Sequence, residues 1–376
     1  MATVKVEPTT FRRSELSVWS TRLRIERVIP APPPALAYQP KYHTIAHTIL
    51  ERETLAATVP DEMFKLVDTL IDEAKQLGIS GQLTDDAQIA VACGKIDNLL
   101  INHGFVYPPT GLTQLLSDGL TPKHVDAQEL QSILNQFHNF RRRDFINHHP
   151  DGPFYYVDCD TASFLYLGIA DELKLPLFLV EVPGHNFVRW YVSDSHYVDW
   201  ETMDGSALDD NFYRQGFQIP AAQEQNGVFL SKMTPADVLG YCAFVVGGTF
   251  EQQKQWQKAL DEYIICTQRY SRSPEGWNNA AWVLTSARDA TIRNGQKAVT
   301  LALQAVALYP QANNLDTLGC AYAEAGDFDK AIEIESKAAQ LDPTYEKTVV
   351  GFQAHKTWVE QNPEDPNILY VINAHR

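Results

Sequence analysis

The feature that most restricts the fold of this chain is a change of pattern near residue 236. Before it, helical periodicity is mixed with short apolar runs that are typical of strands. After it, the strand patterns stop and Ala-rich helical periods begin, in which small and apolar residues recur every three to four positions. A chain with this pattern is expected to fold as an α+β part followed by an all-helical part.

The clearest helical unit lies between residues 315 and 343. Its small, aromatic and proline residues stand at the spacing of two packed helices: Leu315, Leu318, Gly319, Tyr322, Gly326, Phe328, Ala331, Ala338 and Pro343. Gly319 and Ala338 allow the two helices to approach closely, because neither carries a large side chain. Pro343 ends the second helix. These offsets resemble those of a tetratricopeptide repeat, with Glu335 standing where that family usually has an aromatic residue.

An earlier unit opens at Trp277 and closes at Pro310, and residues 236–270 form a weaker first unit. The resemblance implies about three tetratricopeptide repeats over residues 224–343, with residues 344–376 as a C-terminal cap. Such a solenoid presents a concave groove, so a protein or peptide partner is expected to bind there. The acidity of the chain favours a basic or apolar partner segment.

Composition excludes several classes of function. The net charge of −16 makes nucleic acid an unfavourable partner, because phosphate groups are repelled. No apolar run is long enough to span a membrane. The five cysteines are scattered and never form a CxxC motif, which argues against a disulfide framework and a zinc knuckle and favours a reducing, cytoplasmic location. No cofactor is expected.

The N-terminal part divides into an arm and a domain. Residues 1–40 are rich in proline and are expected to form an arm, whereas residues 41–223 are expected to form the α+β domain. Apolar periodicity predicts helices over four ranges: 61–77, 85–102, 126–140 and 159–173. Three strands are predicted after them, over 177–182, 187–192 and 196–200, with a turn at 193–195.

Three residues of this domain form a pattern that could carry chemistry. Cys159 begins the last of those helices, where the electropositive helix N-terminus stabilises a thiolate. His185 follows the Pro183-Gly184 corner, and Asp199 lies on the returning strand. Asp199 and Glu201 share one strand face, so the register decides which carboxylate reaches His185. Together these residues could provide a nucleophile, a base and an orienting acid.

Each of these residues also has a structural interpretation. A buried cysteine is usually a small apolar filler, and His185 could be a hydrogen-bonded core histidine. Asp158 and Asp160 flank the thiol, and their negative charges disfavour a thiolate. Asp158 could instead cap the helix.

The segments around these residues resemble the bacterial transglutaminase-like superfamily, whose core is papain-like, and within it the SirB1-like branch. The resemblance rests on Cys159–Tyr166, Leu175–Leu177, Val182–Trp190 and Val198–Thr202, and its most specific part is the Pro-Gly-His-x-Phe-x-Arg run. It implies that Cys159 is the nucleophile, His185 the base and Asp199 the acid, on a helix packed against antiparallel strands. Bacterial proteins that join such a core to tetratricopeptide repeats are the nearest resemblance.

Further site residues are less strongly indicated. The backbone N–H of Cys159, with Asn102 or Asn98, could stabilise an oxyanion, and Asn186, Trp190 and Trp200 could line a cleft, although aromatic strand residues are more often core. His43, His47 and Glu51 recur every four residues but lack the HExxH pattern, so no metal site is expected.

Two functions follow from these patterns. The first is a cysteine acyl-transfer enzyme, either a peptidase or amidase with water as acceptor or a transglutaminase with an amine as acceptor. The second is a binding or scaffold protein, in which the transglutaminase-like core is inactive and the repeats hold a partner.

Overall fold

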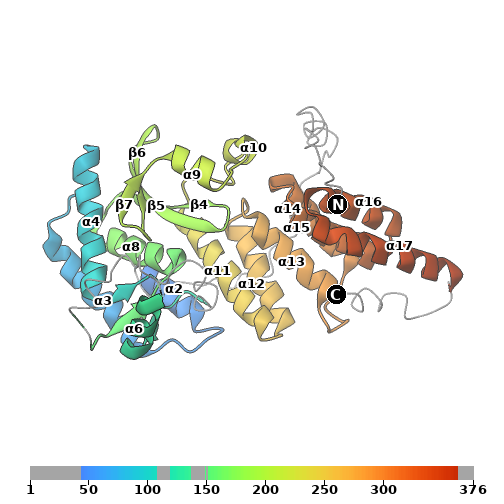
Figure 1. Ribbon diagram of the computed structural model, residues 1–376, viewed down its shortest axis with the longest axis horizontal. Helices are drawn as coiled ribbons and strands as arrows, with labels where there is room; N and C mark the ends of the chain where they lie inside the picture. The colour runs from blue at the N-terminus through green and yellow to red at the C-terminus, as the bar shows by residue number, and fades with distance from the viewer. Residues whose placement is uncertain (1–43, 108–118, 137–148, 150, 363–376) are drawn as a thin grey trace, which may run out of the picture. The chain divides into compact units, whose positions relative to one another are not determined.

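The computed structural model describes residues 44–107, 119–136, 149 and 151–362. All of them belong to one compact unit, 39–376. The predicted N-terminal arm and the end of the C-terminal cap lie outside the described residues. The described chain combines a mixed α/β part with a helical C-terminal part, as predicted (Figure 1).

Among the described residues, four helical segments precede the first strand: α2 (Ile45–Glu53), α3 (Asp61–Ala74), the short 3-10 helix η1 (Lys75–Leu77) and α4 (Asp86–Asn102). The α4 helix begins where the Asp85 carboxylate accepts a hydrogen bond from the Gln88 backbone N–H at 3.0 Å. Such caps satisfy amide groups that the helix itself leaves unpaired. The predicted helices over 61–77 and 85–102 are thereby confirmed.

A small three-stranded sheet follows, in the order β1-β3-β2. Its strands are β1 (Phe105–Val106), β2 (Lys123–Val125) and β3 (Phe154–Tyr156), with β1 parallel and β2 antiparallel to β3. Helix α6 (Ala127–Gln136) lies between β2 and β3 along the chain, so it confirms the first part of the helix predicted over 126–140. The remainder of that prediction lies outside the described residues.

The second sheet is antiparallel throughout, in the order β4-β5-β6-β7. Its strands are β4 (Leu177–Val182), β5 (His185–Ser193), β6 (His196–Glu201) and β7 (Ser206–Leu208). Helix α8 (Cys159–Leu173) immediately precedes it, beginning at the Asp158 cap and ending at Lys174, whose φ of 56° is left-handed. The helix predicted over 159–173 and the three predicted strands are confirmed.

The two faces of this sheet have different neighbours, because successive side chains of a strand point to opposite sides. Leu179, Val188, Trp190, Val198 and Trp200 share a buried cluster with α8. The alternate residues Val180, Val182 and Phe187 pack with Tyr213 of α9 (Asp210–Gly216) and with the segment 228–230. We call these the α8 face and the α9 face.

The helical part begins after the short helix α10 (Ala221–Gln225). Its members are α11 (Pro235–Gln252), α12 (Trp256–Arg269), α13 (Pro274–Ser286), α14 (Gly295–Leu308), α15 (Ala312–Glu324), α16 (Phe328–Leu341), η2 (Pro343–Tyr345) and α17 (Glu346–Gln361). Consecutive helices pack against each other, as Figure 1 shows. A Cβ atom on Gly319 would lie 2.6 Å from Glu335 Oε2 of the next helix, so a larger residue there would require the end of the Glu335 side chain to shift. None of the described helices combines the length and the apolar character of a membrane span.

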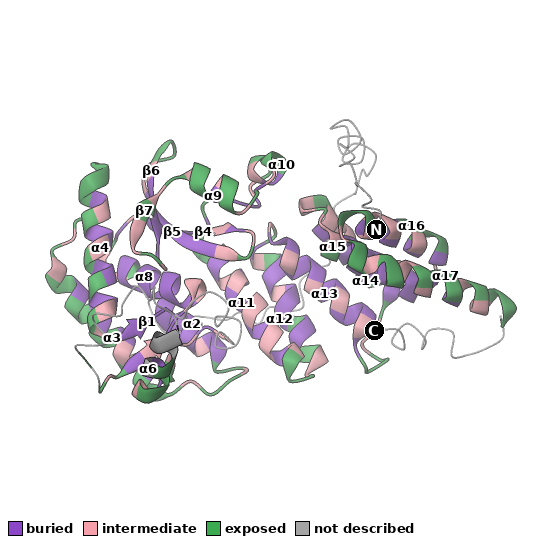
Figure 2. Cartoon of the chain, in the orientation of Figure 1, coloured by how far each residue is buried: buried purple, intermediate pink, exposed green. Residues whose placement is uncertain are grey.

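The first of these helices shares a hydrophobic core with the sheet. Val238 and Cys242 of α11, together with Tyr270, belong to the same buried cluster as Trp190 on the α8 face, and buried residues continue from α8 into α11 (Figure 2). Arg52 of α2 and Glu262 of α12 form a buried ion pair across the same region. The boundary expected between residues 223 and 224 therefore does not separate two hydrophobic cores.

A buried carboxyl group lies at this junction. The Tyr270 hydroxyl donates a hydrogen bond to Glu181 Oε2 on β4 at 2.7 Å. Burial raises the pKa of Glu181 to about 8, and the nearby Glu275 adds to the rise. A carboxyl group with a raised pKa holds its proton more tightly in the folded state than in the unfolded state. Its stabilising contribution is therefore present at low pH and is lost as the pH rises towards 8.

We expect Glu181→Gln to remove most of this pH dependence. Between pH 5 and pH 8 the free energy of unfolding of the wild-type protein should fall by roughly 3 kcal/mol more than that of the variant, because each pKa unit corresponds to about 1.4 kcal/mol. Urea denaturation at several pH values measures the difference. Glu62→Gln, on the exposed surface of α3, is the control and should behave like the wild type. Parallel pH profiles for the wild type and Glu181→Gln would contradict the assignment.

Candidate functional site

Cys159 is the first residue of α8. Asp158 caps this helix, because its Oδ1 accepts hydrogen bonds from the backbone N–H and the hydroxyl of Thr161, both at 2.9 Å. Asp158 thus has the capping role that the sequence indicated. The five cysteines, all within the described residues, form no disulfide, and Cys159 is partly exposed, whereas Cys93, Cys242, Cys266 and Cys320 are buried.

The surroundings of the Cys159 sulfur disfavour a thiolate. Its Sγ lies 3.7 Å from Asp160 Oδ1. Burial raises the pKa of the Cys159 thiol well above its usual range, and the negative charges of Asp160 and Asp158 raise it further. The backbone N–H of Asn186 acts in the opposite direction as a hydrogen-bond donor. The positive end of the α8 dipole is therefore outweighed by burial and by two neighbouring carboxylates.

Asp160 is itself enclosed by polar side chains. Its Oδ1 accepts hydrogen bonds from the Asn186 side-chain amide and from the Tyr241 hydroxyl of α11, the latter at 2.9 Å. Burial raises the pKa of Asp160 to about 7, Asp158 adds to the rise, and the hydrogen bonds from Tyr241 and Asn186 oppose it. No local pattern in the sequence indicates Tyr241, which is 81 residues away and reaches Asp160 through the packing of α11.

His185 forms a close pair with Glu201. His185 Nε2 is 2.7 Å from Glu201 Oε2, and the imidazole stacks on Phe217 with ring centroids 5.3 Å apart and planes 4° apart. Glu201 also accepts a hydrogen bond from the Met203 backbone N–H at 2.9 Å and one from the Tyr213 hydroxyl at 3.3 Å. This buried carboxylate holds the ring firmly in one orientation.

The prediction that Asp199 orients His185 is wrong, and the alternative acid, Glu201, makes this contact. Asp199 is paired across the strands with Arg189, whose guanidinium binds its carboxylate through Nε and Nη2. The same guanidinium also binds Asp210 of α9. Glu201 lies two residues further along β6, on the same face and closer to the end of β5 that carries His185. The sequence does not show the register that places Arg189 opposite Asp199. Arg189 binds Asp199, so Glu201 is the acid that contacts His185.

The Cys159 sulfur lies beside the backbone N–H of Asn186, the residue that follows His185 on β5. His185 points to the α9 face, where it meets Phe217 and Glu201, whereas its neighbour Asn186 points to the α8 face, where it meets Asp160. Among the described residues, no hydrogen bond joins the Cys159 sulfur to the His185 ring. The structure therefore does not bring the predicted nucleophile and base into the expected contact, and their catalytic roles stay predictions.

The remaining predicted site residues fall into different places. Asn102 is exposed at the end of α4 and makes no described hydrogen bond with Cys159 or His185. Asn186 contacts the Cys159 region through Asp160, as expected of a residue near the site. Trp200 is part of the core on the α8 face, where its indole N–H donates to the Tyr166 hydroxyl at 2.9 Å, so its structural interpretation applies.

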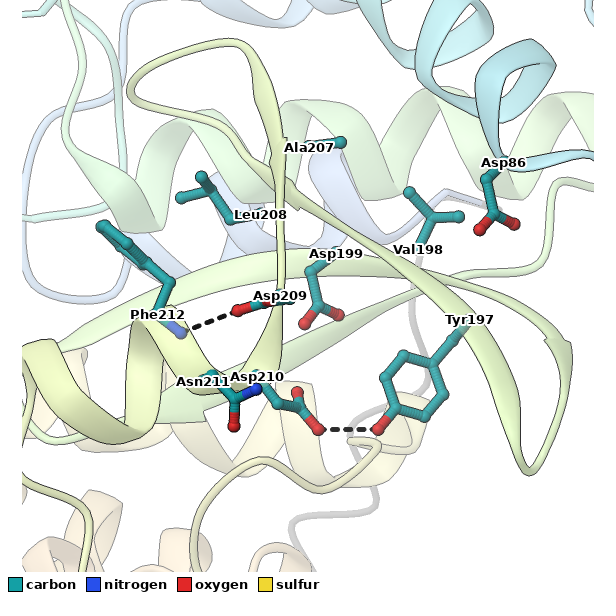
Figure 3. A pocket seen from close by; sticks show the side chains of 10 residues that line it. All are labelled: Asp86, Tyr197, Val198, Asp199, Ala207, Leu208, Asp209, Asp210, Asn211 and Phe212. Carbon is teal, nitrogen blue, oxygen red and sulfur yellow. Dashed lines mark hydrogen bonds between the residues drawn. The ribbon is translucent and has the colours of Figure 1, made fainter.

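A cavity of about 690 Å³ lies beside Asp199 and Asp210 (Figure 3). Its lining residues are Asp86, Tyr197, Val198, Asp199, Ala207, Leu208, Asp209, Asp210, Asn211 and Phe212. The four carboxylates already have protein partners: Asp86 pairs with His196, Asp199 and Asp210 with Arg189, and Asp209 caps α9. Within the described part of the chain, no group of three or more His, Cys, Asp or Glu side chains is arranged to hold a metal ion.

Comparison with known proteins gives no family for this chain, since no protein-family model matches it and no curated protein sequence matches it.

The assignment of the acid can be tested with Glu201→Gln and Asp199→Asn. Glu201→Gln should shift the ¹⁵N resonances of the His185 ring, because it changes the group that faces Nε2, whereas Asp199→Asn should leave them in place. Asp199→Asn should instead lower the free energy of unfolding by about 2–3 kcal/mol, since it removes one partner of a buried arginine. NMR of ¹⁵N-labelled protein and urea denaturation measure the two effects. A His185 resonance that moves in Asp199→Asn alone would restore Asp199 as the orienting acid.

Proposed function

We propose that this chain is a binding protein, in which a transglutaminase-like core with an unactivated thiol is joined to tetratricopeptide-type helical hairpins that hold a protein or peptide partner. One observation carries the proposal: the Cys159 sulfur lies 3.7 Å from Asp160 Oδ1, no described hydrogen bond joins it to the His185 ring, and burial with the neighbouring acids raises the pKa of the thiol well above its usual range. A cysteine enzyme needs a thiolate and a base within hydrogen-bonding distance of it.

The order of elements supports the transglutaminase-like, papain-like part of the proposal. A helix that begins at the cysteine packs against antiparallel strands, the histidine opens the second of these strands, and an acid on the third contacts its ring. This is the arrangement implied by the resemblance, with Glu201 in place of Asp199. An inactive core fits this arrangement, because the helix and strands are present but no described hydrogen bond joins Cys159 to His185.

The helices α11–α16 support the binding role. They succeed one another as helices of 13 to 18 residues with small residues at the contacts, among them Gly319, Ala331 and Ala338. Cys266 and Cys320 are buried, as fillers of the helical core are expected to be. The chain carries a net charge of −16, which favours a basic or apolar partner segment. Five cysteines without a disulfide fit a reducing compartment such as the cytoplasm.

A cysteine acyl-transfer enzyme is the second candidate, and two contacts favour it. Glu201 holds His185 at 2.7 Å, as an orienting acid would, and the Asn186 backbone N–H lies beside the sulfur, where a donor could stabilise an oxyanion. In such a reaction the thiolate attacks the carbonyl carbon, and His185 carries the proton to the leaving amine. Water or an amine then attacks the thioester carbonyl, so that the acyl group is transferred and the thiol is regenerated. This route requires a hydrogen bond between the His185 ring and the Cys159 sulfur, which is not among the hydrogen bonds of the described residues.

The two candidates differ in the reactivity of Cys159. For the binding protein, iodoacetamide should modify Cys159 at pH 8 at least about tenfold more slowly than it modifies glutathione, because the thiolate fraction falls tenfold for each unit by which the pKa rises. Mass spectrometry of the cysteine-containing peptides of the native protein measures the rate at each site. A Cys159 that reacts faster than glutathione would contradict the proposal and favour the enzyme. Modification after unfolding in urea is the control that shows each peptide to be detectable.

A further inference from the structure

One carboxylate oxygen connects the Cys159 thiol to the helical part of the chain. Asp160 Oδ1 lies 3.7 Å from Cys159 Sγ, and the same oxygen accepts hydrogen bonds from the Asn186 amide and the Tyr241 hydroxyl. Asn186 belongs to strand β5, whereas Tyr241 belongs to α11, the first helix of the helical part. The thiol, the sheet and α11 therefore meet at a single atom.

Hydrogen-bond donors affect the pKa of Asp160, and the charge of Asp160 then affects the pKa of Cys159. Tyr241 and Asn186 lower the pKa of Asp160 and so favour its ionised form, while burial raises that pKa to about 7. Ionised Asp160 in turn raises the pKa of the Cys159 thiol. A donor on α11 thus favours a carboxylate, and the carboxylate favours a protonated thiol.

The other charged groups that influence this cluster are also acids. Asp158 lies on α8, Glu181 on β4 and Glu201 on β6. Each makes a further negative charge at Cys159 or Asp160 less favourable, but only Asp160 contacts the sulfur and also has a partner on α11. The effect of α11 on the thiol therefore passes through Asp160.

We propose that Tyr241 and Asp160 form a relay through which α11 holds the Cys159 thiol in its protonated, unreactive form. The inference rests on the proposed function, because it names the contact that keeps the thiol of the core unactivated. A movement of α11 that withdraws the Tyr241 hydroxyl leaves Asp160 with fewer donors. Asp160 then takes up a proton near neutral pH, and the thiol beside it ionises more readily.

Asp160→Asn and Tyr241→Phe test the relay in the full-length protein, with the rate of Cys159 alkylation by iodoacetamide as the readout. In this assay the thiolate forms a carbon–sulfur bond and displaces iodide. Asp160→Asn should raise the rate at pH 8 about tenfold, because loss of an adjacent negative charge lowers a pKa by roughly two units and the weaker nucleophile offsets about half of that gain. Tyr241→Phe should give a smaller rise, about threefold.

The pH dependence distinguishes the relay from a loosened structure. The increase in the Cys159 alkylation rate caused by Tyr241→Phe should be largest between about pH 7 and 8, where Asp160 is ionised in the wild type and partly protonated in the variant. At higher pH the increase should disappear, because Asp160 is then ionised in both proteins. The double variant Asp160→Asn/Tyr241→Phe should react like Asp160→Asn alone, because the hydroxyl acts only through the carboxylate.

Tyr270→Phe is the matched control. It removes a hydroxyl of the same kind, which donates to Glu181 at 2.7 Å across the same junction without contacting Asp160. Its Cys159 rate should equal that of the wild type. A rate in Tyr270→Phe as high as in Tyr241→Phe, or an unchanged rate in Asp160→Asn, would overturn the relay. A wild-type Cys159 that reacts with iodoacetamide faster than glutathione does would instead contradict the proposed function. Failure of the relay and failure of the proposed function are therefore distinguishable.

Discussion

The alternation of side chains along strand β5 is the constraint on which the rest of the site depends. His185 and Asn186 are consecutive residues, so their side chains must point to opposite faces of the sheet. His185 therefore meets Glu201 and Phe217 on the α9 face, whereas Asn186 meets Asp160 beside Cys159 on the α8 face. The same period places Arg189 opposite Asp199, which removes that acid from the histidine. The different partners of His185, Asn186 and Asp199 are thus a consequence of backbone geometry.

The shared core between the sheet and α11 has a second consequence. Because Val238 and Cys242 pack with residues of the α8 face, α11 lies against the domain that carries the cysteine. Polar groups buried in such a junction need partners, and here tyrosine hydroxyls of the helical part supply them: Tyr241 for Asp160 and Tyr270 for Glu181. A partner bound at the helical hairpins, as proposed, would therefore be coupled to the charges of Asp160 and Glu181 through the hydroxyl groups of Tyr241 and Tyr270.

Much of the fold could be predicted from the sequence, because it is expressed in local patterns. The α8 helix follows from its apolar stripe and Asp158 cap, and the strand boundaries follow from the Pro183-Gly184 corner and the 193–195 turn. The change of sequence pattern near residue 236 likewise predicts the change from mixed to helical structure, which begins with α11 at Pro235. The described part of the cap expected over residues 344–376 contains helix α17 (Glu346–Gln361).

The site could be predicted only in part, because it depends on register and on tertiary packing. Periodicity placed Asp199 and Glu201 on one face but could not show that Arg189 would stand opposite Asp199. Placement at the helix N-terminus indicated an activated Cys159, yet burial and Asp160 determine the opposite charge state. Tyr241 had no local signal at all, since its role arises from the contact of two distant helices.

The central claim, that the thiol of Cys159 stays protonated, is tested most directly by the thiolate absorbance near 240 nm, followed against pH and compared between the wild type and Cys159→Ser. The four other cysteines are buried and common to both proteins, so the difference isolates Cys159. The account predicts no thiolate step in the difference titration below about pH 9, because the pKa of Cys159 is raised well above this value. A step of one thiolate below pH 8 would contradict it.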